Sequence, residues 1–133
     1  MRVLATRYFA RWAKYDKVSN KKILDAIHEL QNGLHDGNLG GDIYKKRISI
    51  NNRGKRDSGR TIIAFKDGNN VFCLLGYPKS KKETITDEEL ETLQKIAKEY
   101  FLLHEKEVDI FIKNKKFIEV NYEEKTNKKN KEI

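Results

Sequence analysis

The chain has 133 residues, of which 38% are hydrophobic and 36% charged, so it can bury one compact core but is too short for two domains of ordinary size. This composition excludes a disordered polymer, and no stretch approaches the roughly 18 apolar residues that span a bilayer. The net charge of +8 favours a polyanion such as RNA or DNA as a partner, with a solvated basic loop as the alternative. We expect a soluble cytoplasmic protein with a single domain over residues 1–122 and no membrane partner.

A short strand, an amphipathic helix and a loop are expected in the first third of the chain. Val3–Thr6 is a candidate strand, and the aromatic and small residues after it can begin a helix whose start the sequence does not fix. Ser19 is a suitable N-cap for a second helix, whose apolar residues recur at helical spacing until Gly33, just past the C-cap. Leu34–Asp42 is rich in Gly, Asn and Asp, so we expect a loop there.

Three consecutive antiparallel strands are predicted in the centre of the chain. Ile43–Ile50 alternates between two faces, which is the period-two pattern of a strand. A basic loop is expected over Asn51–Gly59, and Arg60–Lys66 alternates again. Asp67-Gly68-Asn69-Asn70 is a hairpin-turn sequence, and the apolar run Val71–Tyr77 that follows has a length that suits a central strand.

The C-terminal third is predicted to be mainly helical. Thr86 and Glu89 have the spacing of a capping box, and apolar residues then recur at helical spacing as far as Phe101. After that helix we expect a short helix over Glu105–Lys115, a strand over Phe117–Tyr122 and a disordered, Lys-rich tail over Glu123–Ile133. Because the predicted strands are grouped and do not alternate with helices, the expected fold class is α+β.

Positive charge is concentrated around the first two of the central strands. Residues 44–60 carry seven Lys and Arg residues against one acid, a local net charge of +6. Lys45 and Arg47 fall on one face of the predicted strand, and Lys46 falls on the other. More cations follow the third strand, and the strand ends of a meander can converge, so these charges can form one surface.

Residue types suited to metal or nucleophilic chemistry are sparse. The histidines His28, His35 and His104 are scattered along the chain, and Cys73 is the only cysteine. Cys73 lies in an apolar run, so we expect it to be a buried strand residue. Ser58 lacks the Gly-x-Ser-x-Gly context of a nucleophile elbow. We therefore expect neither a metal nor a cofactor.

The remaining groups, cations and hydroxyls, suit cleavage of RNA by its own 2′-hydroxyl. That reaction requires the 2′-oxygen to be held in line with the scissile phosphate, the phosphorane charge to be neutralised and two protons to be moved. Lys and Arg can neutralise the charge without a metal, and a desolvated Lys among other cations can have its pKa lowered enough to move a proton. Tyr77 can stack on a base or donate a proton. The alternative for each cation is that it only holds phosphate.

Six short blocks occur in order along the chain: Tyr8-Phe9-Ala10-Arg11-Trp12-Ala13, Leu39-Gly40-Gly41, Tyr44-Lys45-Lys46-Arg47, Gly54-Lys55, Arg60-Thr61 and Gly76-Tyr77-Pro78-Lys79. With this order and spacing, residues 6–122 resemble the RelE/HigB superfamily of toxins from bacterial toxin–antitoxin modules. The resemblance implies a small RelE-like α+β fold, with N-terminal helices packed on a curved antiparallel sheet and a C-terminal helix. It also implies an endoribonuclease that cuts mRNA, usually in the ribosomal decoding site, by 2′-hydroxyl attack and without a metal.

The resemblance also points to particular site residues. Those expected to be catalytic are Arg60, Lys79, Lys46 and Lys55, with Arg60 the first choice for stabilising the phosphate charge. The other cations and the tyrosine of this region, Lys45, Arg47, Arg53, Arg56, Tyr77 and Lys82, are expected to contact RNA. In two places the chain departs from the family pattern: Arg56-Asp57-Ser58 stands where the family has Ser-Gly-Gly, and Ser80 replaces a common Asn. Asp57 can pair with Arg56 and reduce the positive field of the loop, so a weakened toxin is one expectation to test.

A cognate antitoxin is the partner that the resemblance implies. In this branch it is usually a small helix-turn-helix DNA-binding protein, which masks the toxin and represses the shared operon. Its binding to the basic face would be partly sensitive to salt. Two other functions stay open for the same scaffold: a toxin that binds gyrase, as gyrase-poisoning relatives do, and a nucleic-acid-binding regulator without catalysis.

Overall fold

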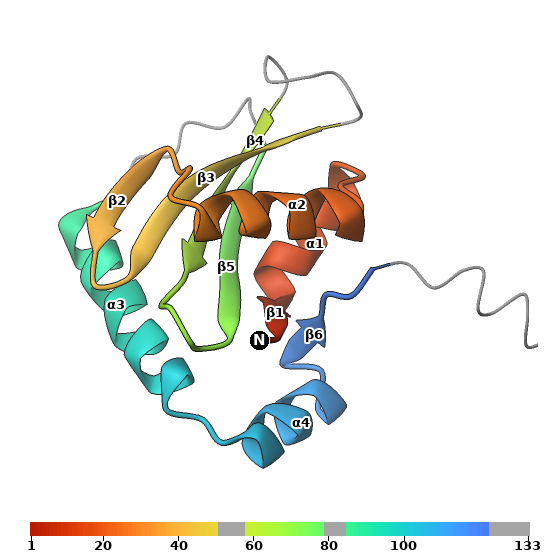
Figure 1. Ribbon diagram of the computed structural model, residues 1–133, viewed down its shortest axis with the longest axis vertical. Coiled ribbons are helices and arrows are strands. Elements are labelled where there is room, and N and C mark those ends of the chain that lie inside the picture. The colour runs from red at the N-terminus through yellow and green to blue at the C-terminus, as the bar shows by residue number, and fades with distance from the viewer. Residues whose placement is uncertain (51–57, 79–84, 123–133) are drawn as a thin grey trace, which may run out of the picture.

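The computed structural model of the protein describes residues 1–50, 58–78 and 85–122 (Figure 1). Within these ranges a six-stranded sheet has the order β2-β3-β4-β5-β1-β6. Its strands are β1 (Val3–Thr6), β2 (Gly37–Gly40), β3 (Ile43–Ser49), β4 (Ser58–Ala64), β5 (Val71–Tyr77) and β6 (Phe117–Glu119). The helices are α1 (Arg7–Tyr15), α2 (Asn20–Gln31), α3 (Asp87–Phe101) and α4 (Glu105–Lys113). The predicted α+β class is confirmed.

The centre of the sheet is the predicted meander, in which β3, β4 and β5 pair antiparallel in sequence order. β1 then pairs in parallel with β5, with Val3 opposite Val71, and β6 pairs antiparallel with β1. The candidate strand at Val3–Thr6 is therefore confirmed. Among the described strands, pairing is antiparallel except for the pair β1–β5, which the sequence did not predict.

The loop predicted over Leu34–Asp42 is wrong in part, because residues 37–40 of this segment form β2. Gly37 lies opposite Lys45 and Asn38 lies opposite Tyr44, with an irregularity in register before Gly40. Hydrogen bonds to the edge of β3 outweigh the turn preference of a Gly- and Asn-rich sequence, since strand propensity depends strongly on the neighbouring strand.

Several helices and strands begin or end at other residues than the sequence predicted. β4 begins at Ser58, two residues before the predicted start at Arg60, because Ser58 pairs with Ser49 across the end of β3. The predicted C-terminal ends at Ile50, Lys66, Lys115 and Tyr122 become Ser49 for β3, Ala64 for β4, Lys113 for α4 and Glu119 for β6. Strand and helix ends are decided by pairing and fraying rather than by residue pattern alone.

Helices cover both faces of the sheet, so the fold has a core on each side (Figure 1). On the α1/α2 face, Phe9, Ile27 and Ile63 belong to one buried cluster. On the α3/α4 face, Phe72 is surrounded by the rings of Tyr100, Phe101 and Phe117, at centroid distances between 5.2 and 5.7 Å. Because successive strand residues point to opposite faces, each strand contributes to both cores.

The predicted helix starts are confirmed by their caps. Ser19 Oγ accepts a hydrogen bond from the Lys22 amide at 3.2 Å, and Gly33 has a φ of 86° just after the C-cap of α2. Thr86 and Glu89 form both bonds of the capping box of α3, each 3.0 Å long. α1, whose start the sequence did not fix, begins after Thr6, which accepts a bond from the Phe9 amide.

Trp12 packs against two glycines on the α1/α2 face. A Cβ added to Gly59 would lie 2.2 Å from Trp12 Cζ2, and one added to Gly76 would lie 2.4 Å from Trp12 Cε3. The indole therefore occupies the space that side chains at both positions would need. Gly59 and Gly76 directly precede Arg60 and Tyr77, whose side chains point to the opposite face. Trp12 thus supports the sheet directly behind those two residues.

Candidate functional site

Three polar side chains form a row across the meander on the α3/α4 face. Arg47 of β3 lies opposite Arg60 of β4, and Arg60 lies opposite Tyr77 of β5. Directly opposite residues in antiparallel strands have Cβ atoms about 5 Å apart. Lys45 lies on the same face, two residues before Arg47 and opposite Ile62. The register of three strands therefore brings together residues that are 30 positions apart in the sequence.

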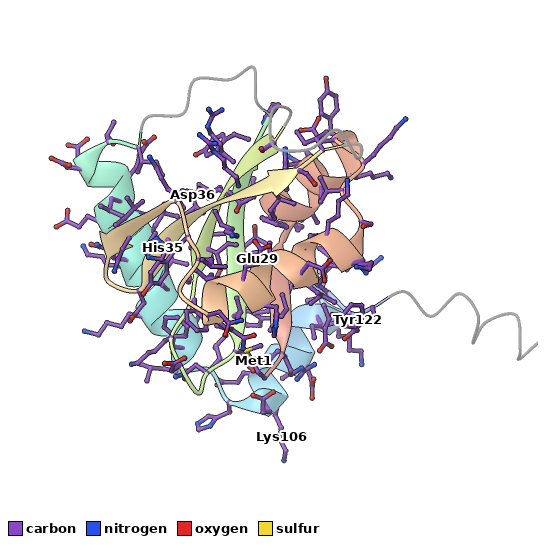
Figure 2. All side chains as sticks on the ribbon, turned by 45° about the horizontal axis from the view of Figure 1, so that its top comes forward. Met1, Glu29, His35, Asp36, Lys106 and Tyr122 are labelled. Atoms are coloured by element: carbon purple, nitrogen blue, oxygen red, sulfur yellow. The ribbon has the colours of Figure 1, made fainter. Side chains whose placement is uncertain are left out.

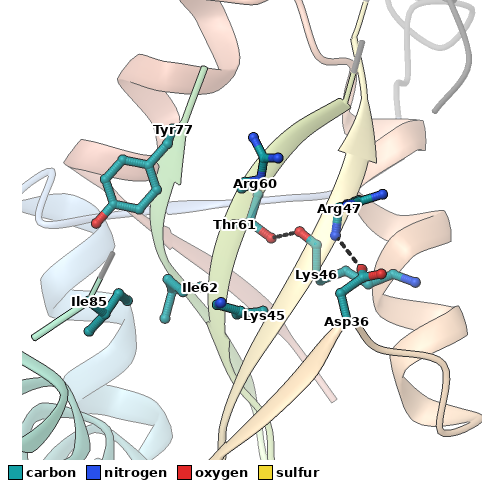
Figure 3. Close-up of a pocket in the computed structure, with 9 residues that line it drawn as sticks. All are labelled: Asp36, Lys45, Lys46, Arg47, Arg60, Thr61, Ile62, Tyr77 and Ile85. Atoms are coloured by element: carbon teal, nitrogen blue, oxygen red, sulfur yellow. Dashed lines mark hydrogen bonds between the residues drawn. The ribbon is translucent and has the colours of Figure 1, made fainter. Parts of the chain in front are cut away.

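The row borders a cavity of about 120 Å³, the cationic cavity, which Figure 3 shows. Uncharged residues line it beside the charged ones. Its lining residues are Asp36, Lys45, Lys46, Arg47, Arg60, Thr61, Ile62, Tyr77 and Ile85. A second cavity, of about 330 Å³, lies on the α2 side of β3 and shares Asp36, Lys46 and Arg47 with the first.

The charge of the cationic cavity suits an anion. Lys45 and Arg47 are exposed, and Arg60 and Tyr77 are half-buried. Among the described residues, no carboxylate lies within ion-pair distance of the Lys45 ammonium or the Arg47 guanidinium. Two exposed cations next to a half-buried arginine produce a positive field that attracts phosphate, and a guanidinium can bind two phosphate oxygens at once.

Lys46 has a different environment from its neighbours. Its side chain is 8% exposed, and its Nζ lies 2.7 Å from Glu29 Oε1 of α2 and donates a 3.0 Å hydrogen bond to the Leu34 carbonyl. Figure 2 labels Glu29 on α2 and Asp36 at the end of the linker that follows this helix. The Lys46 carbonyl accepts a 2.6 Å bond from the buried Thr61 hydroxyl. The Lys46 ammonium therefore joins β3 to α2 on the face opposite the row, as the alternation pattern predicted.

Asp36 is the charged lining residue that sequence reasoning missed. Its backbone N–H donates to the Lys45 carbonyl at 2.9 Å, and its Oδ2 accepts a 2.8 Å bond from the Arg47 N–H (Figure 3). In the sequence it belongs to a Gly- and Asn-rich segment that reads as a turn. No local pattern indicates that this segment continues along the edge of β3, so only the pairing of β2 with β3 could have revealed it.

The structure brings together four of the predicted site residues: Arg60, Lys45, Arg47 and Tyr77. It places Lys46 on the other face of β3. The predicted residues Arg53, Lys55, Arg56, Lys79 and Lys82 lie outside the described residues, as does the pairing expected between Asp57 and Arg56. Their roles stay predictions from the sequence.

Within the described ranges, the structure contains neither a cluster of metal-ligating side chains nor a membrane-spanning helix. No group of three or more His, Cys, Asp or Glu side chains there is arranged to hold a metal ion. No helix in the same part of the chain combines the length and the apolar composition that crossing a membrane requires.

Comparison with protein families identifies the class to which this fold and site belong. The family model described as the RelE toxin of the RelE / RelB toxin-antitoxin system matches residues 1–120. The chain therefore belongs to the RelE toxin family, as the resemblance of its sequence blocks predicted. No significant match was found among curated proteins. As a member of this family, the chain is the toxin of a toxin–antitoxin pair, and its partner is an antitoxin.

Proposed function

We propose that this toxin is an endoribonuclease that cleaves mRNA by attack of the 2′-hydroxyl, with protein side chains in place of a metal. The observation that carries the proposal is the strand register that aligns Arg47, Arg60 and Tyr77 over the cationic cavity. Membership of the RelE family supports the same reaction, because RelE toxins are generally endoribonucleases.

Arg47 and Arg60 are the proposed phosphate-binding pair. Two guanidinium groups on adjacent strands can contact the two non-bridging oxygens of one phosphodiester. Negative charge on these oxygens grows as the 2′-oxygen attacks, so fixed cations stabilise the phosphorane more than the ground state. Arg60 is half-buried and lies in the middle of the row, where water screens its charge less than that of exposed Arg47.

Tyr77 and Lys45 complete the proposed phosphate site. Tyr77 flanks Arg60 on the β5 side, where its phenol can give a proton to the departing 5′-oxygen or stack on an adjacent base. Lys45 is one step along β3 from Arg47 on the same face, which suits a neighbouring phosphate of the chain. Lys55 and Lys79 stay proposed catalytic residues, and Arg53, Arg56 and Lys82 stay proposed RNA contacts, from the sequence alone.

For Lys46 we propose a positioning role in place of the predicted catalytic one. Its ammonium is engaged with Glu29 and the Leu34 carbonyl on the far side of β3. These contacts fix the linker that carries Asp36, and Asp36 in turn binds the Arg47 backbone. Lys46 thereby acts on the row through other residues.

The proposed physiological substrate is mRNA in the decoding site of the ribosome, in the cytoplasm. The proposed antitoxin is a helix-turn-helix protein that covers the cationic face. Contacts between an acidic antitoxin segment and exposed Lys45 and Arg47 would weaken as salt rises, because exposed charges are screened over about 10 Å at 0.1 M ionic strength.

The test is to express the toxin from an inducible promoter and map the 5′ ends of a translated transcript and of the same transcript without its start codon. Cuts in the translated form alone are expected. Cuts in both would indicate a ribonuclease that needs no ribosome. Growth arrest without cuts, accompanied by DNA damage, would replace this proposal with a gyrase-binding toxin, and neither cuts nor arrest would favour a nucleic-acid-binding regulator.

A further inference from the structure

The proposed reaction needs a group that accepts the 2′-hydroxyl proton, and the cationic cavity contains one. At neutral pH a carboxylate is ordinarily unprotonated, whereas Lys and Arg are ordinarily protonated and Tyr carries its proton. Asp36 is the single carboxylate among the described residues that line this cavity. It is therefore the side chain of this lining that, as a carboxylate, only accepts hydrogen bonds and can take up a proton.

The position of Asp36 relative to the row matches the geometry of the reaction. Its Oδ2 bonds to the Arg47 N–H at the edge of β3 that faces away from β4, whereas Arg60 pairs with the opposite edge of β3. Across the sheet the order is thus Asp36, Arg47, Arg60 and Tyr77 (Figure 3). Since adjacent strands are about 4.8 Å apart, a phosphate on the two arginines would have the carboxylate on one side and the phenol on the other.

An in-line displacement at phosphorus needs a base and an acid on opposite sides of the phosphate. The attacking 2′-oxygen and the leaving 5′-oxygen lie on opposite sides of the phosphorus atom, so the base and the acid must approach from opposite directions. We propose that Asp36 is the general base of the cleavage, an inference that rests on the proposed endoribonuclease function.

The proposed step balances as follows. The 2′-oxygen transfers its proton to the Asp36 carboxylate as the bond from this oxygen to phosphorus forms. The bond from phosphorus to the 5′-oxygen breaks, and that oxygen takes the phenolic proton of Tyr77. The products are a 2′,3′-cyclic phosphate and a 5′-hydroxyl, and proton exchange with water restores the carboxylate and the phenol.

Two contacts hold the carboxylate ready for this role. One oxygen, Oδ2, is fixed by the Arg47 N–H, and the Asp36 backbone is fixed by the Lys45 carbonyl. Within the described parts of the chain, the other oxygen, Oδ1, has no hydrogen-bond partner, and the side chain is exposed at the rim of the cavity. A base needs one accessible oxygen and a fixed orientation, and Asp36 has both.

The first experiment separates the base from a purely structural acceptor. Asp36→Asn keeps an oxygen that can accept from the Arg47 N–H but removes the basic carboxylate, whereas Asp36→Ala removes both. Asp42→Asn is the matched control, because Asp42 is an acid of the same segment that does not line the cationic cavity and has a φ of 66°, which Asn tolerates. The full-length toxin and its variants are assayed with an mRNA fragment, free or in the ribosomal decoding site, whichever form the wild type cuts.

With a general base at Asp36, both Asp36→Asn and Asp36→Ala lower the cleavage rate constant about 10²- to 10⁴-fold, and Asp42→Asn does not. Binding of the same fragment with a 2′-deoxy nucleotide at the cut site stays within about threefold of wild type for Asp36→Asn. A wild-type rate in Asp36→Asn with a loss in Asp36→Ala would make Asp36 a positioning residue and overturn the proposal.

The second experiment assigns the direction of proton transfer. The 5′-bridging oxygen at the cut site is replaced by sulfur, which leaves as a thiolate and needs no proton, since a thiol has a pKa near 8.5 and an alcohol one close to that of water. Tyr77→Phe should cut this substrate at nearly the wild-type rate, and Asp36→Asn should remain slow. If the sulfur substrate restored the rate of Asp36→Asn, Asp36 would be the general acid and not the general base. If the wild type cuts neither substrate, free or on the ribosome, the endoribonuclease proposal itself fails.

Discussion

The two faces of the meander differ in the residues that they carry near the ends of β4 and β5: one face has glycines and the other has polar side chains. On the α1/α2 face, Gly59 and Gly76 leave space that Trp12 fills to within contact distance. On the α3/α4 face, the next residues, Arg60 and Tyr77, border the cationic cavity. Of two residues adjacent in the sequence, one is therefore constrained by packing against Trp12 and the other by the chemistry of the cavity. Motif blocks such as Arg60-Thr61 and Gly76-Tyr77 combine one residue for packing with one for chemistry, and variants of the two should be separable by stability and activity.

The largest expected effect is on the packed face. Trp12→Ala should lower the free energy of unfolding by about 3–5 kcal/mol, because a buried indole leaves a cavity. Gly76→Ala should cost about 1–3 kcal/mol in the wild type, because its methyl group overlaps the indole. In the Trp12→Ala background the Gly76→Ala change should cost much less. Chemical denaturation of the four proteins measures this coupling, and simple additivity of the two losses would contradict the packing described for Trp12.

The open face should show the reverse pattern. Arg60→Ala should reduce cleavage of mRNA about 10²- to 10³-fold, the effect of removing one donor that stabilises an oxyanion, and should change the midpoint of denaturation little. Lys95→Ala, at an exposed position of α3 away from the cavity, is the control for loss of one charge. Cleavage rates and denaturation curves are compared for the same preparations. Full activity in Arg60→Ala would move the phosphate site elsewhere.

Lys46 links the two faces, because it lies in β3 between Lys45 and Arg47 while its side chain points to the α1/α2 face. Lys46→Met should lower stability by about 1.5–3 kcal/mol, the cost of losing a hydrogen bond made by a charged group. The cleavage rate per folded molecule should fall less than tenfold. Active-site titration with the 2′-deoxy fragment supplies the folded fraction. A loss as large as that of Arg60→Ala would instead support the catalytic role predicted from sequence.

Cys73 offers a pH test of the packed face. Burial raises the pKa of its thiol to about 12 from an ordinary value of 9.0, so the unfolded chain ionises this thiol first. The contribution of the neutral thiol to stability is therefore fully present below pH 9 and is lost as pH rises toward 12. Cys73→Ala should show a smaller decline in stability over that range. In the native protein at pH 8 the thiol should react with a disulfide reagent only at the rate of unfolding.

The smallest expected effect is at the ion-pair network of Arg2, whose carbonyl accepts a hydrogen bond from the Val71 N–H at the start of β5. Its guanidinium contacts Glu105, Asp109 and Glu119 at 2.9–3.0 Å, and hydrogen bonds from Arg2 and then from Asn70 lower the pKa of Glu105. The stabilisation that this lowered pKa gives is fully present above the pKa of Glu105 in the unfolded chain, near 4.5. It is lost as pH falls through the lower pKa of Glu105 in the folded protein. Because Glu105 is exposed, solvent screens the effect. In Arg2→Gln, the free energy of unfolding should fall slightly less steeply as pH drops below 4.5. Cleavage of mRNA should be unchanged.

Local signals in the sequence predicted the elements well where each element carries its own pattern. The cap at Ser19, the capping box of Thr86 and the alternation of the central strands are short-range features, and the structure confirms them. β2 was missed because its pairing partner, not its composition, makes it a strand. The parallel position of β1 depends on contacts about 68 residues apart, which no local pattern contains.

The candidate site was also predictable only where local patterns in the sequence describe it. Charge density predicted the region, and alternation predicted that Lys46 faces away from Lys45 and Arg47. The cross-strand order of Arg47, Arg60 and Tyr77 required the register, and the presence of Asp36 required β2. Trp12 was quoted as part of a family block, but its reason for being there, the two glycines behind the row, is visible only in three dimensions.

The most direct test of the central claim is the chemistry of the ends that the purified toxin makes on its mRNA substrate. Attack by the 2′-hydroxyl on a phosphate held by Arg47 and Arg60 predicts a 2′,3′-cyclic phosphate and a 5′-hydroxyl. The same ends should become at least 100-fold rarer with Arg60→Ala. Ends carrying a 5′-phosphate, or undiminished cutting by Arg60→Ala, would contradict the account.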